Sequence, residues 1–225
     1  MTPMHLESEL KYTARDERPL NDLASGDSLG PARLGPGSTV HELDRYLDTA
    51  DLRLEAVRWA CRLRSRNGTT IVSLKGPAEH LPGEVLHRRA EVEGPAGPSL
   101  DPNTWAPSDA RDHLVAMTGG APLVERFVLE QDRTERTVRV ARDRAGELSL
   151  DRVRILHRGT EVGRMYVVEL ELDPSAVDGG LDSAPLAAAI SAVEGLVADP
   201  VSKLGGAPHA AGGLSRVSLP AGGGG

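Results

Sequence analysis

The chain has few aromatic residues and a single cysteine. Only 3% of its 225 residues are Phe, Trp or Tyr, so a hydrophobic core must be built from Leu, Val, Ile and Ala, for which a hydrophobic fraction of 39% suffices. The lone cysteine, Cys61, excludes an internal disulfide and a zinc site made of several thiolates. These absences are typical of a protein from a reducing compartment.

Long apolar runs and an excess of positive charge are missing as well. No run approaches the roughly 20 apolar residues that a membrane span requires, and the N-terminus lacks the basic, apolar and small-residue pattern of a signal peptide. The formal net charge of -7 argues against broad affinity for nucleic acid, because binding to the phosphate backbone needs a basic surface. We therefore expect a cytoplasmic protein that binds neither membrane nor nucleic acid.

Lysine is rare among the basic residues. Of 26 Lys and Arg residues only three are lysines, at positions Lys11, Lys75 and Lys203. A compact ammonium group fits a crowded phosphate site in which the planar fork of arginine does not. The alternative left open by composition alone is that three surface lysines persist in a chain whose codon bias favours arginine.

The periodicity of the sequence predicts mostly strands. Asn67 and Gly68 form a strong hairpin turn within residues 59–76. Two helices are predicted, one over residues 107–120 with Ser108 as N-cap and Gly119 as C-terminal stop, the other over 185–198 with one apolar stripe. Residues 25–38 and 94–107 are rich in Gly, Pro and Ser and predict loops. The remaining strands are predicted over residues 5–13, 39–54, 85–94 and 162–172, and over a hairpin of 125–141 and 147–157 that turns around 143–146.

Charged residues recur at two-residue spacing in these strands. Alternate residues of a strand share one face, so each set of charges lies on one face of its strand. An exposed sheet face gives the same pattern, but such a face usually mixes in Thr, Gln and Ser. A closed antiparallel barrel with a charged interior also fits and leaves no strand edge. The sets are Glu7, Glu9 and Lys11; Arg62 and Arg64; Ser73 and Lys75; Arg89, Glu91 and Glu93; and Glu169 and Glu171.

A charged interior of this kind needs a particular ligand. Facing carboxylates repel one another unless divalent cations bridge them, and inward Arg and Lys side chains repel one another unless polyanions lie between them. A polyphosphate chelated to a metal ion satisfies both sets at once.

The ordered motifs resemble those of the triphosphate tunnel metalloenzymes, the CYTH superfamily, over residues 5–204. The segment ESELK at residues 7–11 matches the family signature of Glu, any residue, Glu, any residue, Lys. It is followed in order by RYLDTADLRL, CRLRSR, VSLKGP, RRAEVE, RTERTV, LSLDRV, VELEL and PVSKL. A single ExExK is weak, but the ordered set is specific, and all three lysines fall on motif positions.

This resemblance implies a mainly β (α+β) fold, a closed eight-stranded antiparallel tunnel with peripheral helices, over residues 1–208. Residues 209–225 are expected to be a flexible Gly-rich tail. The implied cofactor is Mg²⁺ or Mn²⁺, and the implied partner is a small-molecule triphosphate bound by a monomer or homodimer. The implied catalytic residues are Glu7, Glu9, Lys11, Glu169 and Glu171. The implied metal ligands are Glu7, Glu9, Glu91, Glu93, Glu169 and Glu171, and the implied phosphate ligands are Lys11, Arg62, Arg64, Lys75, Arg89, Arg136 and Lys203.

The sequence departs from the family in the strand LEQDRTERTV. The family offers a denser run of bases there, whereas Gln131, Asp132 and Glu135 interrupt it here, so Arg133 is left out of the predicted site. Cys61 alternates with Arg62 and is expected to face outward into packing, as a structural residue rather than a nucleophile.

Three functions compete on this reading. The first is metal-dependent hydrolysis of inorganic tripolyphosphate. The second is action on an organic triphosphate, as a thiamine triphosphatase or a class IV adenylyl cyclase, and the third is a polyphosphate or nucleotide binding module without turnover. An organic substrate needs a pocket for its ring, usually lined by aromatic side chains. With so few aromatic residues available, the sequence favours an enzyme that hydrolyses the inorganic substrate.

Overall fold

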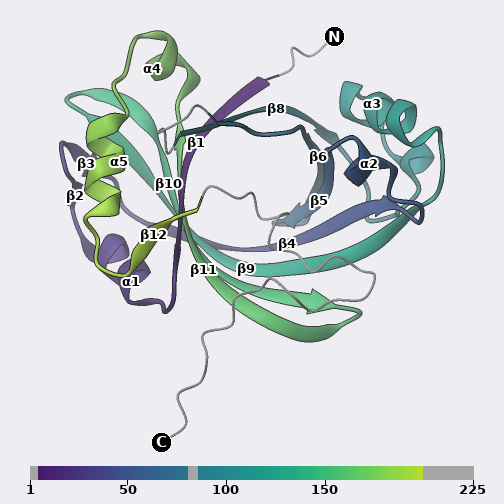
Figure 1. Ribbon diagram of the computed structural model, residues 1–225, viewed down its shortest axis with the longest axis horizontal. Coiled ribbons are helices and arrows are strands. Elements are labelled where there is room, and N and C mark those ends of the chain that lie inside the picture. The colour runs from purple at the N-terminus through teal and green to yellow at the C-terminus, as the bar shows by residue number, and fades with distance from the viewer. Residues whose placement is uncertain (1–4, 81–85, 200–225) are drawn as a thin grey trace, which may run out of the picture.

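A computed structural model describes residues 5–80 and 86–199 and shows a strongly bent sheet with helices on its outside (Figure 1). Lys203 and the Gly-rich tail lie outside the described residues, so their predicted roles and the predicted domain limits stay predictions. The barrel strands are β1 (His5–Ala14), β4 (Ser38–Thr49), β5 (Ala60–Arg66), β6 (Thr69–Lys75), β8 (Leu86–Pro95), β9 (Leu123–Val140), β10 (Asp143–His157) and β11 (Thr160–Leu172). The short strands are β2 (Ser28–Leu29), β3 (Ala32–Leu34), β7 (Glu79–His80) and β12 (Leu196–Ala198).

Eight strands close into one antiparallel barrel. Their order is β1-β8-β6-β5-β4-β9-β10-β11, and β11 pairs with β1 again, with Glu9 opposite Glu171 and Lys11 opposite Glu169. Closure leaves these strands without an exposed edge. The predicted fold class, a mainly β protein built on a closed eight-stranded antiparallel barrel, is confirmed.

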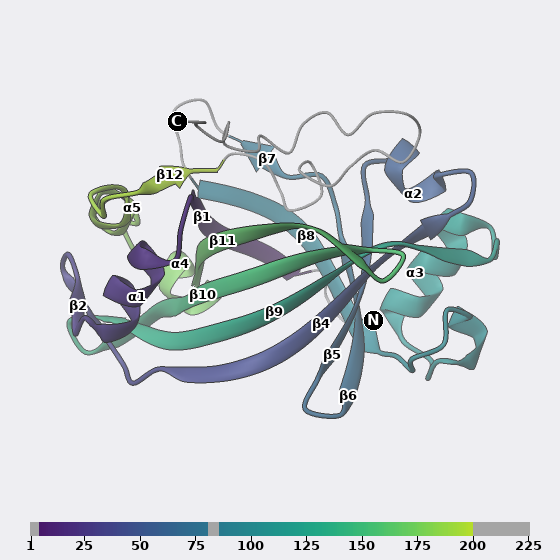
Figure 2. The same ribbon diagram turned by 90° about the horizontal axis from the view of Figure 1, so that it is seen from below.

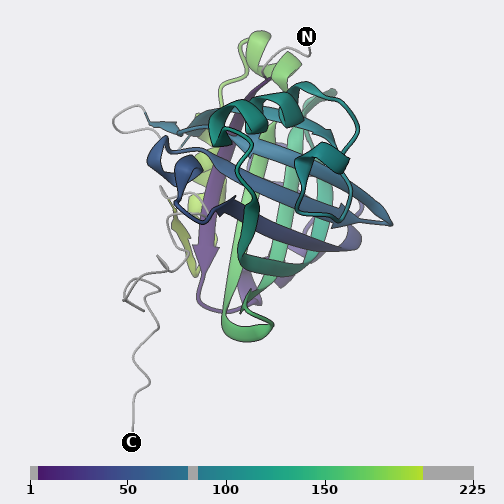
Figure 3. The same cartoon turned by 90° about the vertical axis from the view of Figure 1, so that its right-hand side faces the viewer.

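The helices pack against two parts of the barrel wall. Helices α1 (Arg18–Ser25) and α5 (Ala184–Ser191) lie at one end, whereas α2 (Arg53–Ala56) and α3 (Asp109–Thr118) lie at the other (Figure 2). Figure 3 shows α2 and α3 over the outer face of the strands. Two further short elements are α4 (Pro174–Asp178) and the 3₁₀ helix η1 (Pro102–Thr104). None of the helices in the described ranges is long and apolar enough to cross a membrane.

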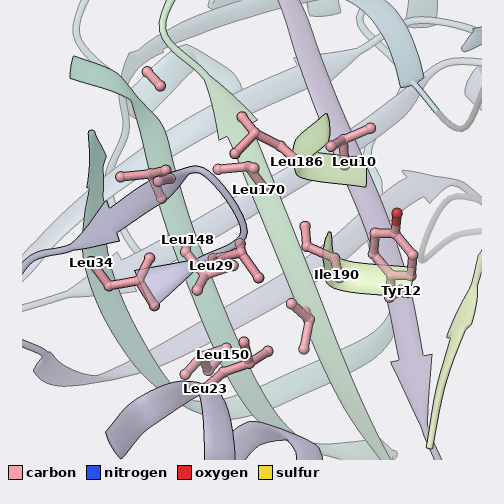
Figure 4. Close-up of a cluster of buried hydrophobic side chains, with 14 of the residues drawn as sticks. Leu10, Tyr12, Leu23, Leu29, Leu34, Leu148, Leu150, Leu170, Leu186 and Ile190 are labelled. Atoms are coloured by element: carbon pink, nitrogen blue, oxygen red, sulfur yellow. The ribbon is translucent and has the colours of Figure 1, made fainter. Parts of the chain in front are cut away.

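Two aliphatic cores hold these helices on the barrel. One lies beneath α1, α5 and the β2–β3 hairpin and includes Leu10, Leu148 and Leu170 from barrel strands (Figure 4). The other joins α2 and α3 to the outer faces of β5 and β6, and it contains Cys61, which is 1% exposed. The outward, structural placement predicted for Cys61 is confirmed. Leucine, valine and isoleucine dominate both cores, as the scarcity of aromatic residues requires.

The local predictions hold except at four places. The turn at Asn67 and Gly68 forms with positive φ at both residues, 51° and 77°, and Ser108 caps α3 by accepting a hydrogen bond from the Arg111 N–H. The predicted turn at 143–146 is wrong, because the β9–β10 turn lies at residues 141–142 and β10 already begins at Asp143. Gly146 instead occupies a β-bulge, where a Cβ atom would collide with the backbone carbonyl of Glu171.

The other three differences concern the strand predicted over 39–54, the C-terminal helix and the first loop. The strand β4 ends at Thr49, and residues 53–54 already belong to α2. The helix predicted over 185–198 ends at Ser191, because Gly195 has a left-handed φ of 88° and turns the chain into β12, which pairs with β1. The loop predicted over 25–38 contains the β2–β3 hairpin, and α1 was not predicted because Pro19 lies in its first turn among polar residues.

Candidate active site

A cavity of about 470 Å³ occupies the interior of the barrel, and every one of the eight barrel strands contributes to its lining. The charged lining residues come from alternate positions of their strands, as the pleat of a β-strand requires. The lining includes eight glutamates, Glu7, Glu9, Glu91, Glu93, Glu135, Glu147, Glu169 and Glu171, and six basic residues, Arg62, Arg64, Arg66, Lys75, Arg89 and Arg133.

Most residues that the sequence marked as site residues meet in this cavity. All six predicted metal ligands line it, together with Arg62, Arg64, Lys75 and Arg89. Lys11 does not line the cavity surface. It is 2% exposed on the same face of β1 as Glu7 and Glu9, and its Nζ lies 3.6 Å from Glu169 Oε1.

Arg136 and Arg133 exchange places relative to the prediction. Arg136 lies outside the cavity, where its guanidinium donates to the backbone carbonyls of Leu23, Ala24, Gly26 and Gly35 at 2.6–3.0 Å. It binds the C-terminal end of α1 and the backbone at Gly26 and Gly35, so the structure does not bring it to the other predicted phosphate ligands. Arg133, which was left out, lines the cavity instead. The two residues are three positions apart on one strand, so they face opposite sides of the sheet.

Glu7 is the centre of one network of ion pairs. Lys75 Nζ lies 2.8 and 2.9 Å from the two Glu7 carboxylate oxygens, and Arg89 Nε lies 2.7 Å from Glu7 Oε2. Arg89 also donates to Glu9 Oε1 at 2.9 Å. Burial raises the pKa of the Glu7 carboxyl, but the positive charges of Lys75 and Arg89 outweigh it and lower that pKa to about 2. Glu7 is therefore ionised and held in place.

A second network lies beneath the arginines. Arg64 forms a two-pronged pair with Asp44 at 2.8 and 2.7 Å, and Arg133 forms one with Asp151 at 2.8 and 2.6 Å. Glu42 accepts from Gln131 Nε2 at 2.6 Å and lies 3.2 Å from Arg64. Burial lowers the pKa of the Arg133 guanidinium, but the Asp151 carboxylate more than offsets this and raises it.

The acids of this second network were missed by sequence reasoning. Glu42, Asp44 and Asp151 are all 0% exposed. A signal for them existed, because Glu42 and Asp44 have the same two-residue spacing as the predicted site residues, and Asp151 lies within the motif LSLDRV. They fix the orientation of the guanidinium groups that face the cavity, since a paired planar fork has little freedom to rotate.

Arg62 differs from these paired arginines. It is 8% exposed and donates one hydrogen bond, from Nη2 to Ser73 Oγ at 3.2 Å. Its Nη1 is 3.5 Å from Asp44 Oδ2, and its buried Nε has no hydrogen-bond partner. Its Nη2 also lies 4.0 Å from Glu91 and 3.9 Å from Glu93, so the guanidinium is held less tightly than the forks of Arg64 and Arg133 and is suited to bind an anion inside the cavity.

Several carboxylates repel one another at the opposite wall. Burial raises the pKa of Glu9, and the negative charge of Glu169 raises it further. Burial and then the charge of Glu7 raise the pKa of Glu171 to about 7, although this side chain is partly open to solvent. With more acids than bases in the lining, a free polyanion would be repelled unless cations accompany it.

The donor set fits a divalent cation by its chemistry. Carboxylate oxygens are the ligands that Mg²⁺ and Mn²⁺ prefer. Glu91 Oε1 is buried and accepts no hydrogen bond, although Lys75 Nζ lies 3.1 Å away. Within residues 5–80 and 86–199, no group of three or more His, Cys, Asp or Glu side chains is arranged to hold a metal ion. Ion pairs explain this, because the Glu7 carboxylate is turned toward Lys75 and the Glu9 carboxylate is turned toward Arg89.

Comparison with known proteins identifies the family. No curated protein matches the chain. Among solved structures, a proposed adenylyl cyclase from Hippeastrum with a dominant triphosphatase activity superposes with a TM-score of 0.63, at 21% identity over 88% of this chain and 93% of the other. A proposed adenylate cyclase from Bacillus halodurans gives a TM-score of 0.52, at 19% identity over 84% of this chain and 92% of the other. The family model of the CYTH domain matches residues 5–190, and the chain therefore belongs to the CYTH domain family.

Proposed function

We propose that this protein hydrolyses inorganic tripolyphosphate in a reaction that depends on Mg²⁺ or Mn²⁺. The observation that carries the proposal is the cavity inside the closed barrel, in which eight glutamates and six basic residues come together from all eight barrel strands. Family membership and the triphosphatase activity of the Hippeastrum protein support the same reaction class.

The basic residues are proposed to bind the phosphates. Arg62, whose acid partners lie 3.5–4.0 Å away, lines the cavity together with Arg64 and Arg133, whose Nε and Nη2 are held by Asp44 and Asp151 so that Nη1 is left for phosphate. Arginine forks match the oxygen geometry of phosphate, and spreading charge over several bases stabilises the transferring phosphoryl group. Lys75 and Arg89 complete this set, and Lys11 acts from beneath through its ion pair with Glu169. Lys203 stays a predicted ligand.

The glutamates are proposed to hold the cation and to position water. Glu7, Glu9, Glu169 and Glu171, with Glu91 and Glu93 beside them, present oxygen atoms to the cavity. A bound divalent cation supplies neutralisation of the phosphate charge and polarisation of its oxygens. The carboxylates accept hydrogen bonds from the attacking water and so orient its lone pair toward phosphorus.

The lining disfavours an organic triphosphate. Among the described residues that line the cavity, Tyr46 is the one aromatic side chain. One face of its ring is already stacked on Phe127, with centroids 4.5 Å apart and planes inclined by 13°. A nucleobase or thiazolium ring therefore lacks the pair of aromatic faces between which such rings usually bind.

Orthophosphate release tests this proposal. Tripolyphosphate, ATP and thiamine triphosphate are each supplied with Mg²⁺, with Mn²⁺ and with a chelator. We expect the highest kcat/KM for tripolyphosphate and no turnover in the chelator. Glu169→Gln should reduce kcat at least about a hundredfold, whereas Glu161→Gln, an ion-paired residue at the start of the same strand and outside the cavity lining, should retain wild-type turnover. A preference for ATP, or equal rates for both variants, would overturn the proposal.

A further inference from the structure

The interior of the barrel has an apolar part as well as a charged part. On β9, Phe127 and Leu129 have the same parity as Arg133, which lines the cavity. On β10, Val153 and Ile155 share their face with Asp151, and on β11 Val167 shares its face with Glu169. Strand pairing is regular over these stretches, so no bulge reverses the faces. These apolar side chains therefore point into the barrel.

These inward apolar side chains are packed against one another. Phe127, Leu129, Val153, Ile155 and Val167 form one buried cluster with Tyr46, and their exposed fractions range from 0% for Val167 to 7% for Phe127. Tyr46 belongs both to this cluster and to the cavity lining, so its ring marks the boundary between the two parts. We call this set of six residues the apolar plug.

The other limit of the cavity is open. The lining reaches Asn67 and Thr69 at the β5–β6 turn, and both residues are exposed. Arg66, on the same turn, is 34% exposed, and Glu93 on β8 is 47% exposed. Exposure thus rises from the plug toward this turn.

We propose that the cavity has a single mouth, at the β5–β6 turn, so that a phosphate chain binds only by inserting a free end. This inference deepens the proposed function, on which it rests, by defining the substrate as a linear polyphosphate with an unblocked terminal phosphate. A chain cannot pass through the plug, because a phosphate group would lose its hydration there without gaining a charged or hydrogen-bonding partner.

The chemistry follows from insertion by the end. The oxygen of a water molecule bonds to the phosphorus of an inserted unit, and the bridging P–O bond breaks. The bridging oxygen leaves with the electron pair of that bond. One proton of the water stays on the new phosphate oxygen, and the other goes to solvent. The products leave through the same mouth, so each turnover requires release of the shortened chain. A long polyphosphate is shortened only from its ends.

Inhibition by phosphate chains of different length tests this geometry with the wild-type protein. Free-ended linear chains of increasing length compete with tripolyphosphate in Mg²⁺, and a long chain with both ends blocked as phosphoramidates is the matched control. Expressed per chain end, the inhibition constant should not change with length, and the blocked chain should bind at least about tenfold more weakly. Inhibition that scales with the number of internal phosphates, equal binding of the blocked chain, or no inhibition by free-ended long chains would each overturn the single-mouth geometry.

Two variants locate the mouth. Thr69→Trp adds bulk at the β5–β6 turn and should raise KM for tripolyphosphate several-fold. Val162→Trp adds the same bulk on β11 at the plug end of the barrel, at an exposed position in the bulge of that strand, and should leave KM unchanged. The reverse result would place the mouth at the other end. If tripolyphosphate is not hydrolysed at all, the proposed function fails, whereas thermal stabilisation by the same free-ended and blocked chains still tests the single mouth.

Discussion

Replacement of Asp151 by Asn removes a buried negative charge while keeping the shape of the side chain. Asp151 is 0% exposed and holds the Arg133 guanidinium through two hydrogen bonds of 2.8 and 2.6 Å. Arg133 retains Glu169 at 3.1 Å and Glu42 at 3.8 Å after the change. The fold should persist, but Arg133 loses its nearest counter-charge and its fixed orientation.

The magnitude follows from the burial of the pair. Removal of one partner from a buried ion pair costs about 3 to 5 kcal/mol. The amide keeps one acceptor and two other acids remain near Arg133, so we expect about 2 to 3 kcal/mol. For a domain of this size, that corresponds to a fall in Tm of roughly 4 to 12 °C. A less well oriented fork should also raise KM for tripolyphosphate about tenfold, or about 1.4 kcal/mol, with a smaller effect on kcat.

Thermal unfolding and steady-state kinetics measure both effects. Asp132→Asn is the matched control, because Asp132 lies beside Arg133 on β9, is 63% exposed and pairs with the exposed His41 at 3.1 Å. This control should change stability by less than about 0.5 kcal/mol. If Asp151→Asn matched the control in both Tm and KM, the reasoning that Asp151 orients Arg133 would be refuted.

Three further predictions concern single side chains. Lys75→Arg should lower turnover roughly thirty- to a thousandfold, because Lys75 lies between Glu7 and Glu91, where we expect a planar fork not to fit. The control Arg18→Lys, on the surface, should have no effect, and equal rates for the two variants would contradict the prediction. The pKa of Glu171 is raised to about 7 in the folded protein. Its contribution to the free energy of unfolding is therefore fully present below the unfolded-state pKa near 4.5 and is lost as pH rises through 7. Glu171→Gln should therefore be more stable than wild type at pH 8, with a free energy of unfolding higher by about 1 kcal/mol, a value reduced because solvent screens this exposed side chain. Its denaturant midpoint should be higher, and equal stability of the two proteins at pH 8 would contradict the prediction. Burial raises the pKa of the Cys61 thiol, so a thiol reagent at pH 8 should label it only in urea.

The barrel and most of its lining could be predicted from the sequence because the pleat of a strand is strictly periodic. Two-residue spacing fixed the faces of Glu7, Glu9, Arg62 and Glu169 without knowledge of their partners. The same rule fails where the register along a strand is unknown. Arg136 was assigned to the tunnel from a motif, but it lies on the opposite face of β9 from Arg133. Arg133 was left out because acidic residues interrupt the run of bases in this strand.

Features set by contacts across the barrel could not be predicted. The pairing of Asp44 with Arg64 and of Asp151 with Arg133 depends on which strands are neighbours after closure. The apolar plug could not be predicted either, because the sequence around Val153 and Val167 does not distinguish a residue inside the barrel from a residue in an outer core. Only closure of the sheet shows that this face lies inside the barrel.

A crystal structure with tripolyphosphate and Mn²⁺, located by its anomalous scattering, tests the central claim most directly. The account predicts the phosphate chain inside the barrel, with oxygens at Arg62 and the Arg133 fork and with Mn²⁺ at the Glu169 and Glu171 carboxylates. It also predicts that one chain end lies next to Tyr46. Tripolyphosphate bound on the outer surface, or Mn²⁺ bound away from the glutamates of the cavity, would contradict it.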